Sequence, residues 1–296
     1  MESTWDCIVI GAGAAGLSAA LVLGRARRRT LVIDAGGQSN RFSEGIGGLL
    51  GQDGRPPAAF YAHGREELAA YPSVELREGT VVAAREGFEV ALADGTVESA
   101  TAVLLATGME YRYPNVPGIA ERWGRSVFHC PFCHGWEHRD GRLAVLDVGG
   151  HRPSLLGLWS DDVALLTNGQ PPEDVPPGVE VDTRVVARLE GSGSSLTAVV
   201  FEDGSSRECT GLLVPVTLHQ RTDLAVQLGA ELAEPGPVAK EAIAVDAQYR
   251  TSVPGLFAAG DATTQMPSVA AAIAAGHMAA AAIVADVVAA RSAAPA

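Results

Sequence analysis

The sequence lacks an excess of positive charge, and this argues against polyanionic partners. It holds 22 lysine and arginine residues against 35 aspartate and glutamate residues, a formal net charge of −13. A surface this acidic repels the phosphates of nucleic acids and the head groups of anionic lipids. We therefore expect no nucleic-acid partner and no binding to a membrane.

Cysteine is also scarce, and nothing at the start of the chain resembles an export signal. Residues 1–6 (MESTWD) carry two acidic side chains and no basic one, whereas secretory signals begin with positive charge. Four cysteines in 296 residues are too few for the disulfide framework of a secreted protein. The sequence therefore indicates a cytoplasmic protein, with a length that suits about two domains.

Only one long apolar stretch, residues 269–290, could suggest a membrane span. It consists largely of alanine, which is only weakly apolar, and it contains His277 and Asp286. Titratable side chains are costly inside a bilayer. We expect a buried helix instead.

What is present begins with a β-α-β pattern at the N-terminus. The apolar run 5–10 predicts a buried strand, GAGAAG (residues 11–16) predicts a tight turn into a helix, and a second strand ends at Asp34. Gly11 permits the turn, Gly13 lets the backbone approach a pyrophosphate, and Gly16 lets the helix pack on the sheet. Glycines alone would also fit a structural turn. With both strands and the acid in place, the pattern predicts a dinucleotide site in which Asp34 binds a ribose.

Two later turns follow buried strands in the same way. Thr107-Gly108 follows AVLLA, and Gly260-Asp261 follows LFAA. Each alone reads as an ordinary strand end. Together with the first motif they resemble the two-dinucleotide-domain flavoproteins, and this resemblance implies FAD. It also implies that the last helix, beginning near Ser268, directs its N-terminus at the isoalloxazine.

The same resemblance implies an α/β fold of two Rossmann-like domains, with the FAD domain discontinuous in sequence. Composition changes place its first part at 1–117, an inserted domain of degenerate NADPH type at 118–242, and its second part at 243–296. The FAD contacts that it assigns are Gly11, Gly13, Ala14, Gly16, Asp34, Ala35, Gln38, Asn40, Thr107, Gly108, Gly260, Asp261, Val269 and Ala270.

The inserted domain opens with a cysteine motif, HCPFCHGWE, at residues 129–137. Cys130 and Cys133 have the spacing of a redox-active disulfide or of half a zinc site, and zinc needs two further ligands. Cys7 and Cys209 sit singly in apparent strands, where a small buried side chain is expected. Flanking histidines and a helix start would lower a thiol pKa. We therefore favour a redox pair and expect no metal.

This motif, following Ala-Thr-Gly, resembles that of the low-molecular-weight thioredoxin reductases, over nearly the whole chain. His134 stands where that family has an acid, and the continuation HGWE looks more like the branch with gliotoxin- and holomycin-type dithiol oxidases. The resemblance implies a homodimer in which Cys133 lies nearest the flavin as a thiolate and Cys130 exchanges with substrate. His134 or His129 would handle protons. His277 could face the site, although a structural role is as plausible for a helical histidine.

A second nucleotide site is degenerate in the sequence. Its loop reads DVGGHRP from Asp147, so that a carboxylate replaces the first glycine, and no arginine pair follows the next strand. The helix after the loop is short. His151 and Arg152 could touch a phosphate, but a solvated loop is favoured, and we expect no tight binding of NADPH.

These features lead to three hypotheses about function. The first is an FAD-dependent oxidase that converts a small dithiol to a disulfide through Cys130 and Cys133, with dioxygen as acceptor. The second is a disulfide reductase, for which a thioredoxin-like protein would be a fitting substrate, supplied by NADPH, ferredoxin or another unusual donor. The third is a flavin-bound redox sensor without turnover, which leaves the paired cysteines unexplained.

Overall fold

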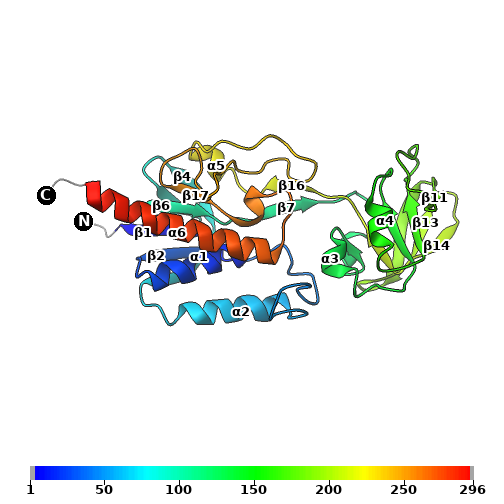
Figure 1. The fold of residues 1–296 in the computed structure, drawn as a ribbon, viewed down its shortest axis with the longest axis horizontal. Coiled ribbons are helices and arrows are strands. Elements are labelled where there is room, and N and C mark those ends of the chain that lie inside the picture. The colour runs from blue at the N-terminus through cyan, green and yellow to red at the C-terminus, as the bar shows by residue number, and fades with distance from the viewer. Residues whose placement is uncertain (1–3, 294–296) are drawn as a thin grey trace. The chain divides into compact units, whose positions relative to one another are not determined.

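The computed structural model describes residues 4–293, and its contacts divide the chain into two compact units. Unit 1 holds the residues up to Ser39, Ala58–Tyr111 and the residues from Thr217 onward, while unit 2 holds Asn40–Pro57 and Arg112–Val216. Each unit is built around a parallel sheet (Figure 1). The expected α/β class, with one domain discontinuous in sequence, is confirmed.

The sheet of unit 1 has a parallel core with an antiparallel extension. The parallel strands follow the spatial order β3 (Val74–Glu78), β2 (Thr30–Asp34), β1 (Trp5–Ile10), β6 (Val97–Leu105) and β17 (Leu256–Ala258). The antiparallel strands β5 (Glu89–Leu92) and β4 (Val81–Arg85) continue from β6. Residues 74–78 pair in parallel with β2.

Two of the helices of unit 1, the first and the last, pack closely because small residues line their contact. The helices of this unit are α1 (Ala14–Arg25), α2 (Pro57–Leu68), the short α5 (Leu224–Gln227) and α6 (Val269–Ala293). A Cβ on Gly276 of α6 would lie 2.0 Å from the carbonyl oxygen of Ala15, so the backbones of α6 and α1 approach to a distance that only glycine allows.

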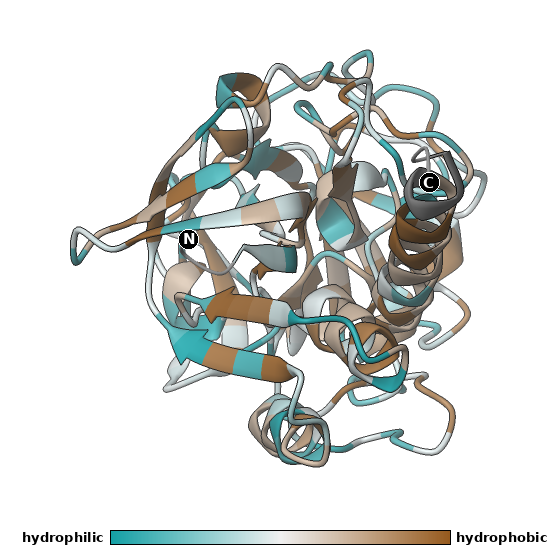
Figure 2. Cartoon of the chain, turned by 90° about the vertical axis from the view of Figure 1, so that its left-hand side faces the viewer, coloured by the Kyte–Doolittle hydropathy of each residue, from teal (hydrophilic) through white to brown (hydrophobic). Residues whose placement is uncertain are grey.

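Helix α6 is the stretch that raised the question of a membrane span. Among the described residues, it is the helix long and apolar enough for one. Its apolar character runs along most of its length (Figure 2). Ala272, Ala275, Ala279 and Ile283 lie in the core shared with α1 and β1, but only 39% of the apolar stretch is buried. The helix therefore buries one face and exposes the other.

Unit 2 combines a parallel sheet with an antiparallel one. The parallel sheet has the order β11 (Glu180–Asp182), β10 (Val163–Leu166), β9 (Leu143–Leu146), β15 (Gly211–Leu213) and β8 (Val127–Phe128). The antiparallel sheet consists of β12 (Val186–Ser192), β13 (Ser195–Phe201) and β14 (Ser206–Glu208). Its helices are short: α3 (Pro131–His134), α4 (Arg152–Leu156) and the 3-10 turn η1 (Ala120–Arg122). Where the chain connects the units, β7 (Met109–Arg112) pairs with β16 (Thr217–Gln220).

The boundaries differ from those that composition suggested. The chain enters unit 2 after Tyr111 and leaves it after Val216, rather than at 117/118 and 242/243. Residues 217–242 belong to unit 1 because they pack there; for example, the Gln227 side chain accepts a hydrogen bond from the Ala84 N–H at 2.9 Å. Residues 40–57 cluster with unit 2. Composition marks linkers, but it does not report these long-range contacts.

Candidate active site

The glycine motif of unit 1 forms a cradle at the start of α1. Gly11 has a φ of +104°, and a Cβ there would lie 2.3 Å from the Ala106 carbonyl oxygen. A Cβ on Gly16 would lie 1.8 Å from the Gly11 carbonyl oxygen, whereas one on Gly13 would meet no atom within 4 Å. Packing therefore requires two of these glycines, and the third leaves open space before a helix whose first N–H groups have no partner within the helix. A pyrophosphate fits this cradle.

Asp34 lies at the end of β2, beside the cradle. Its Oδ1 accepts hydrogen bonds from the N–H groups of Gly36 (3.1 Å) and Ala12 (3.4 Å). Its other oxygen forms an ion pair with Arg65 of α2. The carboxylate is thus fixed where a ribose would meet it. Nothing in the sequence pattern of the polar helix α2 marked Arg65.

The turn after β17 brings a second acid to the same unit. Asp261 accepts a hydrogen bond from the Tyr111 hydroxyl at 2.9 Å, and burial raises the pKa of Asp261. Gly260 has a φ of +80°. Downstream, Ser268 caps α6 by accepting a hydrogen bond from the Ala271 N–H at 3.1 Å, so that Val269 and Ala270 form the first turn, as expected.

Arg221 was not marked by any motif, yet it ties the loop after β2 to the sheet. It donates from Nε to the Met109 carbonyl (3.0 Å), from Nη1 to the Gly37 carbonyl (2.7 Å) and from Nη2 to the Ser39 hydroxyl (3.0 Å). The loop that it holds contains Ala35 and Gln38, two of the expected FAD contacts.

Unit 1 therefore brings together most of the residues expected to bind FAD, and their chemistry fits the cofactor. The cradle supplies backbone donors for the pyrophosphate, Asp34 supplies acceptors for a ribose, and Thr107-Gly108 follows β6 beside Gly11. Asn40 is the exception, because it opens the segment that clusters with unit 2.

In unit 2 the cysteine pair stands at the start of α3. Cys130 is the N-cap residue and Pro131 follows in the first turn. The pKa of Cys130 is lowered to about 7, chiefly because the Cys133 thiol hydrogen-bonds to its thiolate and also because the N–H groups of Cys133 and Phe132 point at it. The same thiol–thiolate bond raises the pKa of Cys133. The N–H groups of Phe132 and Cys133 at the helix start thus favour the first negative charge of the reduced pair on Cys130.

This charge distribution bears on the roles that the resemblance implied. A low pKa suits Cys130 for exchange with substrate, whereas the flavin-facing thiolate was assigned to Cys133; that assignment stays a prediction. The remaining cysteines behave differently. Cys7 and Cys209 are buried, and burial raises the pKa of both thiols, which makes them poor nucleophiles.

The flanking histidines are enclosed by aromatic rings. The ring of Phe128 stacks on that of His134 at a centroid distance of 5.5 Å, and His129 stacks on Trp123 at 5.7 Å. His134 Nε2 lies 3.1 Å from the Gly124 carbonyl oxygen and 3.3 Å from Ser43 Oγ. Burial lowers the pKa of His134, and it lowers that of His129 to about 4. Both imidazoles are therefore neutral near pH 7, and burial makes each a weaker base than a free histidine.

His277 lies on α6 in unit 1, and its side chain is exposed there, while the neighbouring Gly276 faces α1. The helical period therefore turns His277 away from the core of unit 1, and its part in the site stays a prediction.

Residues 40–57, which no motif marked, pack against the cysteine helix. A Cβ on Gly47 would lie 2.7 Å from the Cys133 carbonyl oxygen, so only glycine permits this contact. The Phe42 carbonyl accepts a hydrogen bond from Arg125 Nε at 3.0 Å, next to the contact of Ser43 with His134. Residues 40–57 therefore pack against α3 and help to hold it in place.

The degenerate nucleotide loop of unit 2 is covered by its own chain. The Pro-rich residues 170–177, called the strap below, run along the loop that follows β9. The Glu173 N–H donates to the Val148 carbonyl at 2.7 Å, and the Gly150 N–H donates to the Asp174 carbonyl at 3.2 Å. A Cβ on Gly149 would lie 1.4 Å from the Glu173 carbonyl oxygen. The strap thus takes the Gly150 N–H, a donor that a phosphate could use, and lies against the loop at Val148 and Gly149.

The side chains around this loop, and the short helix after it, further disfavour phosphate binding. Arg152, which could have met a phosphate, forms an ion pair with Asp147 at 2.6 Å, and His151 is exposed. Helix α4 has 5 residues, against 12 in α1.

Among residues 4–293, no group of three or more histidine, cysteine, aspartate or glutamate side chains is arranged to hold a metal ion.

Comparison with known proteins supports the relationship that the motifs suggested. The family described as pyridine nucleotide-disulphide oxidoreductase matches residues 5–151 and 176–276, which leaves out α4 and most of the strap. Thioredoxin reductase tcpT of Claviceps purpurea is 32% identical over 93% of this chain and 91% of its own. The crystal structure of an oxidoreductase from Agrobacterium tumefaciens (35% identity, 97% and 99% coverage) superposes with a TM-score of 0.89. That of HlmI (34%, 99% and 97%) superposes with a TM-score of 0.88. The expected resemblance is confirmed.

Proposed function

We propose that this chain, which belongs to the pyridine nucleotide-disulphide oxidoreductase family and is a flavin-dependent disulfide oxidoreductase, oxidises a small dithiol to a disulfide. In this proposal FAD is the cofactor, dioxygen is the final acceptor, and NADPH takes no part. The observation that carries the proposal is the strap over the second nucleotide loop. We further propose that the enzyme works as a cytoplasmic homodimer.

The strap makes the loop a poor site for a dinucleotide. A pyrophosphate at Val148–Gly150 would displace two backbone hydrogen bonds, those of Glu173 and Gly150. An ordinary hydrogen bond contributes about 0.5–1.5 kcal/mol net, so displacing both costs about 1–3 kcal/mol. The ligand would also meet the carboxylate of Asp147, and the short α4 offers little helix dipole to offset that repulsion.

The cysteine pair is arranged for exchange with a dithiol. A substrate thiolate attacks Cys130 of the enzyme disulfide, and Cys133 leaves as a thiolate. The second substrate thiol then attacks the mixed disulfide, releasing oxidised substrate and the Cys130 thiolate. Exchange is faster when the leaving thiol has a low pKa, and the pKa of Cys130 is lowered to about 7. When bound, FAD supplies a two-electron acceptor that dioxygen reoxidises to give hydrogen peroxide.

The neighbouring histidines suit the proton transfers of this exchange. Substrate thiols must lose protons, and His129 and His134 are neutral imidazoles near pH 7. The contacts of His134 with Gly124 and Ser43 fix its ring beside the motif. We assign the proton acceptor to one of these two residues.

A reductase working in the opposite direction is the second candidate, and the names of relatives such as thioredoxin reductase tcpT favour it. In that case the donor would be ferredoxin, or NADPH bound elsewhere than the strapped loop. Phe132, 68% exposed between the cysteines, would then offer a contact for a thioredoxin-like protein.

Anaerobic reduction of the bound flavin, followed by its visible absorbance, distinguishes the oxidase from the reductase. One sample receives a small dithiol such as dithiothreitol, and the other receives NADPH. We expect bleaching by the dithiol alone, with recovery and hydrogen peroxide when air is admitted, and no dithiol-driven bleaching in Cys130→Ser. Rapid bleaching by NADPH would overturn the oxidase proposal.

A further inference from the structure

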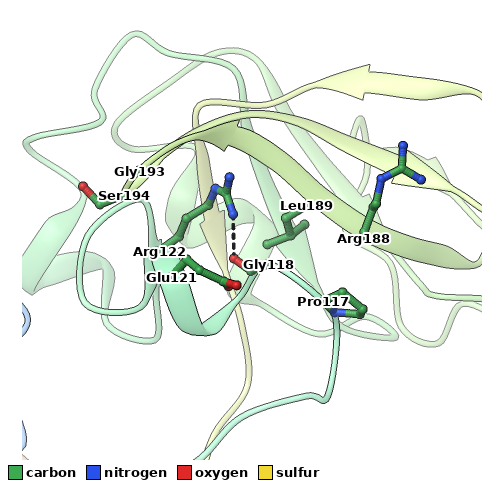
Figure 3. A pocket seen from close by; sticks show the side chains of 8 residues that line it. All are labelled: Pro117, Gly118, Glu121, Arg122, Arg188, Leu189, Gly193 and Ser194. Carbon is green, nitrogen blue, oxygen red and sulfur yellow. Dashed lines mark hydrogen bonds between the residues drawn. The ribbon is translucent and has the colours of Figure 1, made fainter.

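Unit 2 contains an open pocket that the proposed thiol exchange does not use. It has a volume of about 510 Å³ and lies between the turn η1 and the β12–β13 hairpin (Figure 3). Its lining includes Gly118, Glu121, Arg122, Arg188, Leu189 and Ser194. A volume of this size suits a small metabolite.

Arg122, which lines the pocket, is a buried cation without a counter-charge. The residue is only 6% exposed, and its Nε has no hydrogen-bond partner. Its Nη1 donates to the Gly118 carbonyl at 3.0 Å, and among residues 4–293 no carboxylate forms an ion pair with it. Buried arginines are normally paired, because removing an unpaired charge from water is costly. An acceptor is therefore missing from this site.

The free edge of the guanidinium indicates what that acceptor is. Since Nη1 is already used by Gly118, the edge formed by Nε and Nη2 remains. Two parallel N–H donors on one planar edge match the two oxygens of a carboxylate or a phosphate. Arg188, the other arginine of the pocket, is exposed and forms an ion pair with Glu190, so its charge already has a partner.

The walls of the pocket are fixed by the fold. Gly118 has a φ of +94°, and a Cβ there would lie 2.6 Å from the Leu189 carbonyl oxygen and 3.1 Å from Arg122 Nη1. On the other side, the buried Ser126 hydroxyl donates to the Ser194 carbonyl at 2.5 Å and accepts from the Leu196 N–H at 2.9 Å. Arg122 is therefore held in a preorganised site.

We propose that this pocket binds a small oxyanion, a carboxylate or phosphate group, on the Nε–Nη2 edge of Arg122. The net charge of the protein, −13, repels anions in general. Binding must therefore come from local contact with the guanidinium and not from the field of the whole molecule.

The test uses the full chain in chloride buffer at fixed ionic strength, titrated with inorganic phosphate in one arm and succinate in the other. The arginine Nε–H signals are followed by ¹⁵N NMR, and the melting temperature is measured in parallel. We expect one Nε signal, absent in Arg122→Lys, to shift and saturate, and the melting temperature to rise with the anion. A response to either anion alone supports the site and identifies its ligand class.

Two variants exclude a general salt effect, which would raise the melting temperature of every protein. Arg122→Met keeps the length of the side chain without its charge. It should lose at least tenfold in anion affinity while melting no lower than wild type in chloride alone. Arg188→Met is the matched control and should bind within threefold of wild type.

The proposal fails if neither anion moves an Nε signal at tens of millimolar, or if Arg122→Met binds as well as wild type. The NMR arm on wild type decides the question even if a variant does not fold.

Discussion

The two units contain the same kind of loop, a glycine-rich turn between a parallel strand and a helix, and they use it differently. In unit 1 the loop at residues 11–16 has open space at Gly13 and leads into the 12-residue α1, whose first N–H groups have no partner within the helix. In unit 2 the loop at residues 147–150 is covered by the strap, which accepts the Gly150 N–H, and it leads into the 5-residue α4. The same kind of turn therefore leads to an open helix start in one unit and to a covered loop in the other.

Unit 2 uses the start of helix α3 for a chemical purpose. The N–H groups at the start of α3 point at the Cys130 sulfur, so they stabilise a thiolate where unit 1 would stabilise a phosphate. One unit is thus suited to hold a cofactor and the other to hold the group that exchanges with substrate.

The largest effect should come from filling the open cradle. In Gly16→Ala, the added Cβ would lie 1.8 Å from the Gly11 carbonyl oxygen, which must push the loop off α1. We expect less than a tenth of the wild-type flavin content, measured as flavin absorbance per protein. The matched change in unit 2, Gly150→Ala, meets no atom within 4 Å, although its φ of +77° strains the loop locally. It should keep full flavin content because the cradle lies in unit 1. Equal flavin loss in both variants would contradict the assignment of the cofactor to unit 1.

The next effect concerns the thiolate at α3. Because the pKa of Cys130 is lowered to about 7 from 9.0, its reactive form increases as pH rises through 7. At pH 7 about half of it is ionised, against about 1% for an ordinary thiol, a difference of about fiftyfold. Alkylation of the reduced enzyme by iodoacetamide at pH 5–10, with Cys133→Ala as control, measures this. Alanine has no donor and so removes the main stabilising hydrogen bond, and the midpoint of the control should move toward 9. Coincident profiles would refute the thiol–thiolate bond.

The open cradle could be read from the sequence, whereas the closed loop could be read only in part. The β-α-β unit of residues 5–34 follows from local patterns, namely apolar strands, glycine spacing and an acid at a strand end. The degeneracy at Asp147 was also visible. The strap was not, because its contacts are backbone hydrogen bonds between Val148 and Glu173, and a Pro-rich segment carries no side-chain signal for such pairing.

Other residues of the site could not be predicted from the sequence for the same reason. The sequence does not distinguish Arg65, Arg122 and Arg221 from other arginines in polar segments. The fold supplies the partners of Arg65 and Arg221, and it leaves the Nε of Arg122 without a hydrogen-bond acceptor. The support that residues 40–57 give to α3 depends on contacts between positions about ninety residues apart, such as Ser43 and His134. Local periodicity carries no information about such contacts.

A smaller effect should follow from loosening the loop beside the cradle. Arg221→Met removes the hydrogen bonds to Met109, Gly37 and Ser39. Since the loop that it holds carries expected FAD contacts, we expect the dissociation constant of FAD to rise about tenfold, near 1.4 kcal/mol. Fluorescence titration of the apoprotein measures it. Arg25→Met, which removes an exposed arginine bonded to Tyr71, should leave the constant unchanged. If both variants bind FAD as wild type does, Arg221 has no positioning role.

The smallest effect tests the closed loop itself. In Gly149→Ala the added Cβ would lie 1.4 Å from the Glu173 carbonyl oxygen, so the strap must move away. Losing its two backbone hydrogen bonds should cost about 1–3 kcal/mol locally, seen as amide hydrogen exchange at Gly150 and Glu173 at least fivefold faster than in wild type. Flavin content should not change, because the cradle lies in the other unit. NADPH should still fail to bleach the flavin, since Asp147 and the short α4 remain.

Gly157→Ala, at the end of α4, serves as control. Unchanged exchange at Gly150 would mean that the strap does not occupy the loop, and bleaching by NADPH in this variant would mean that the strap alone excludes the nucleotide.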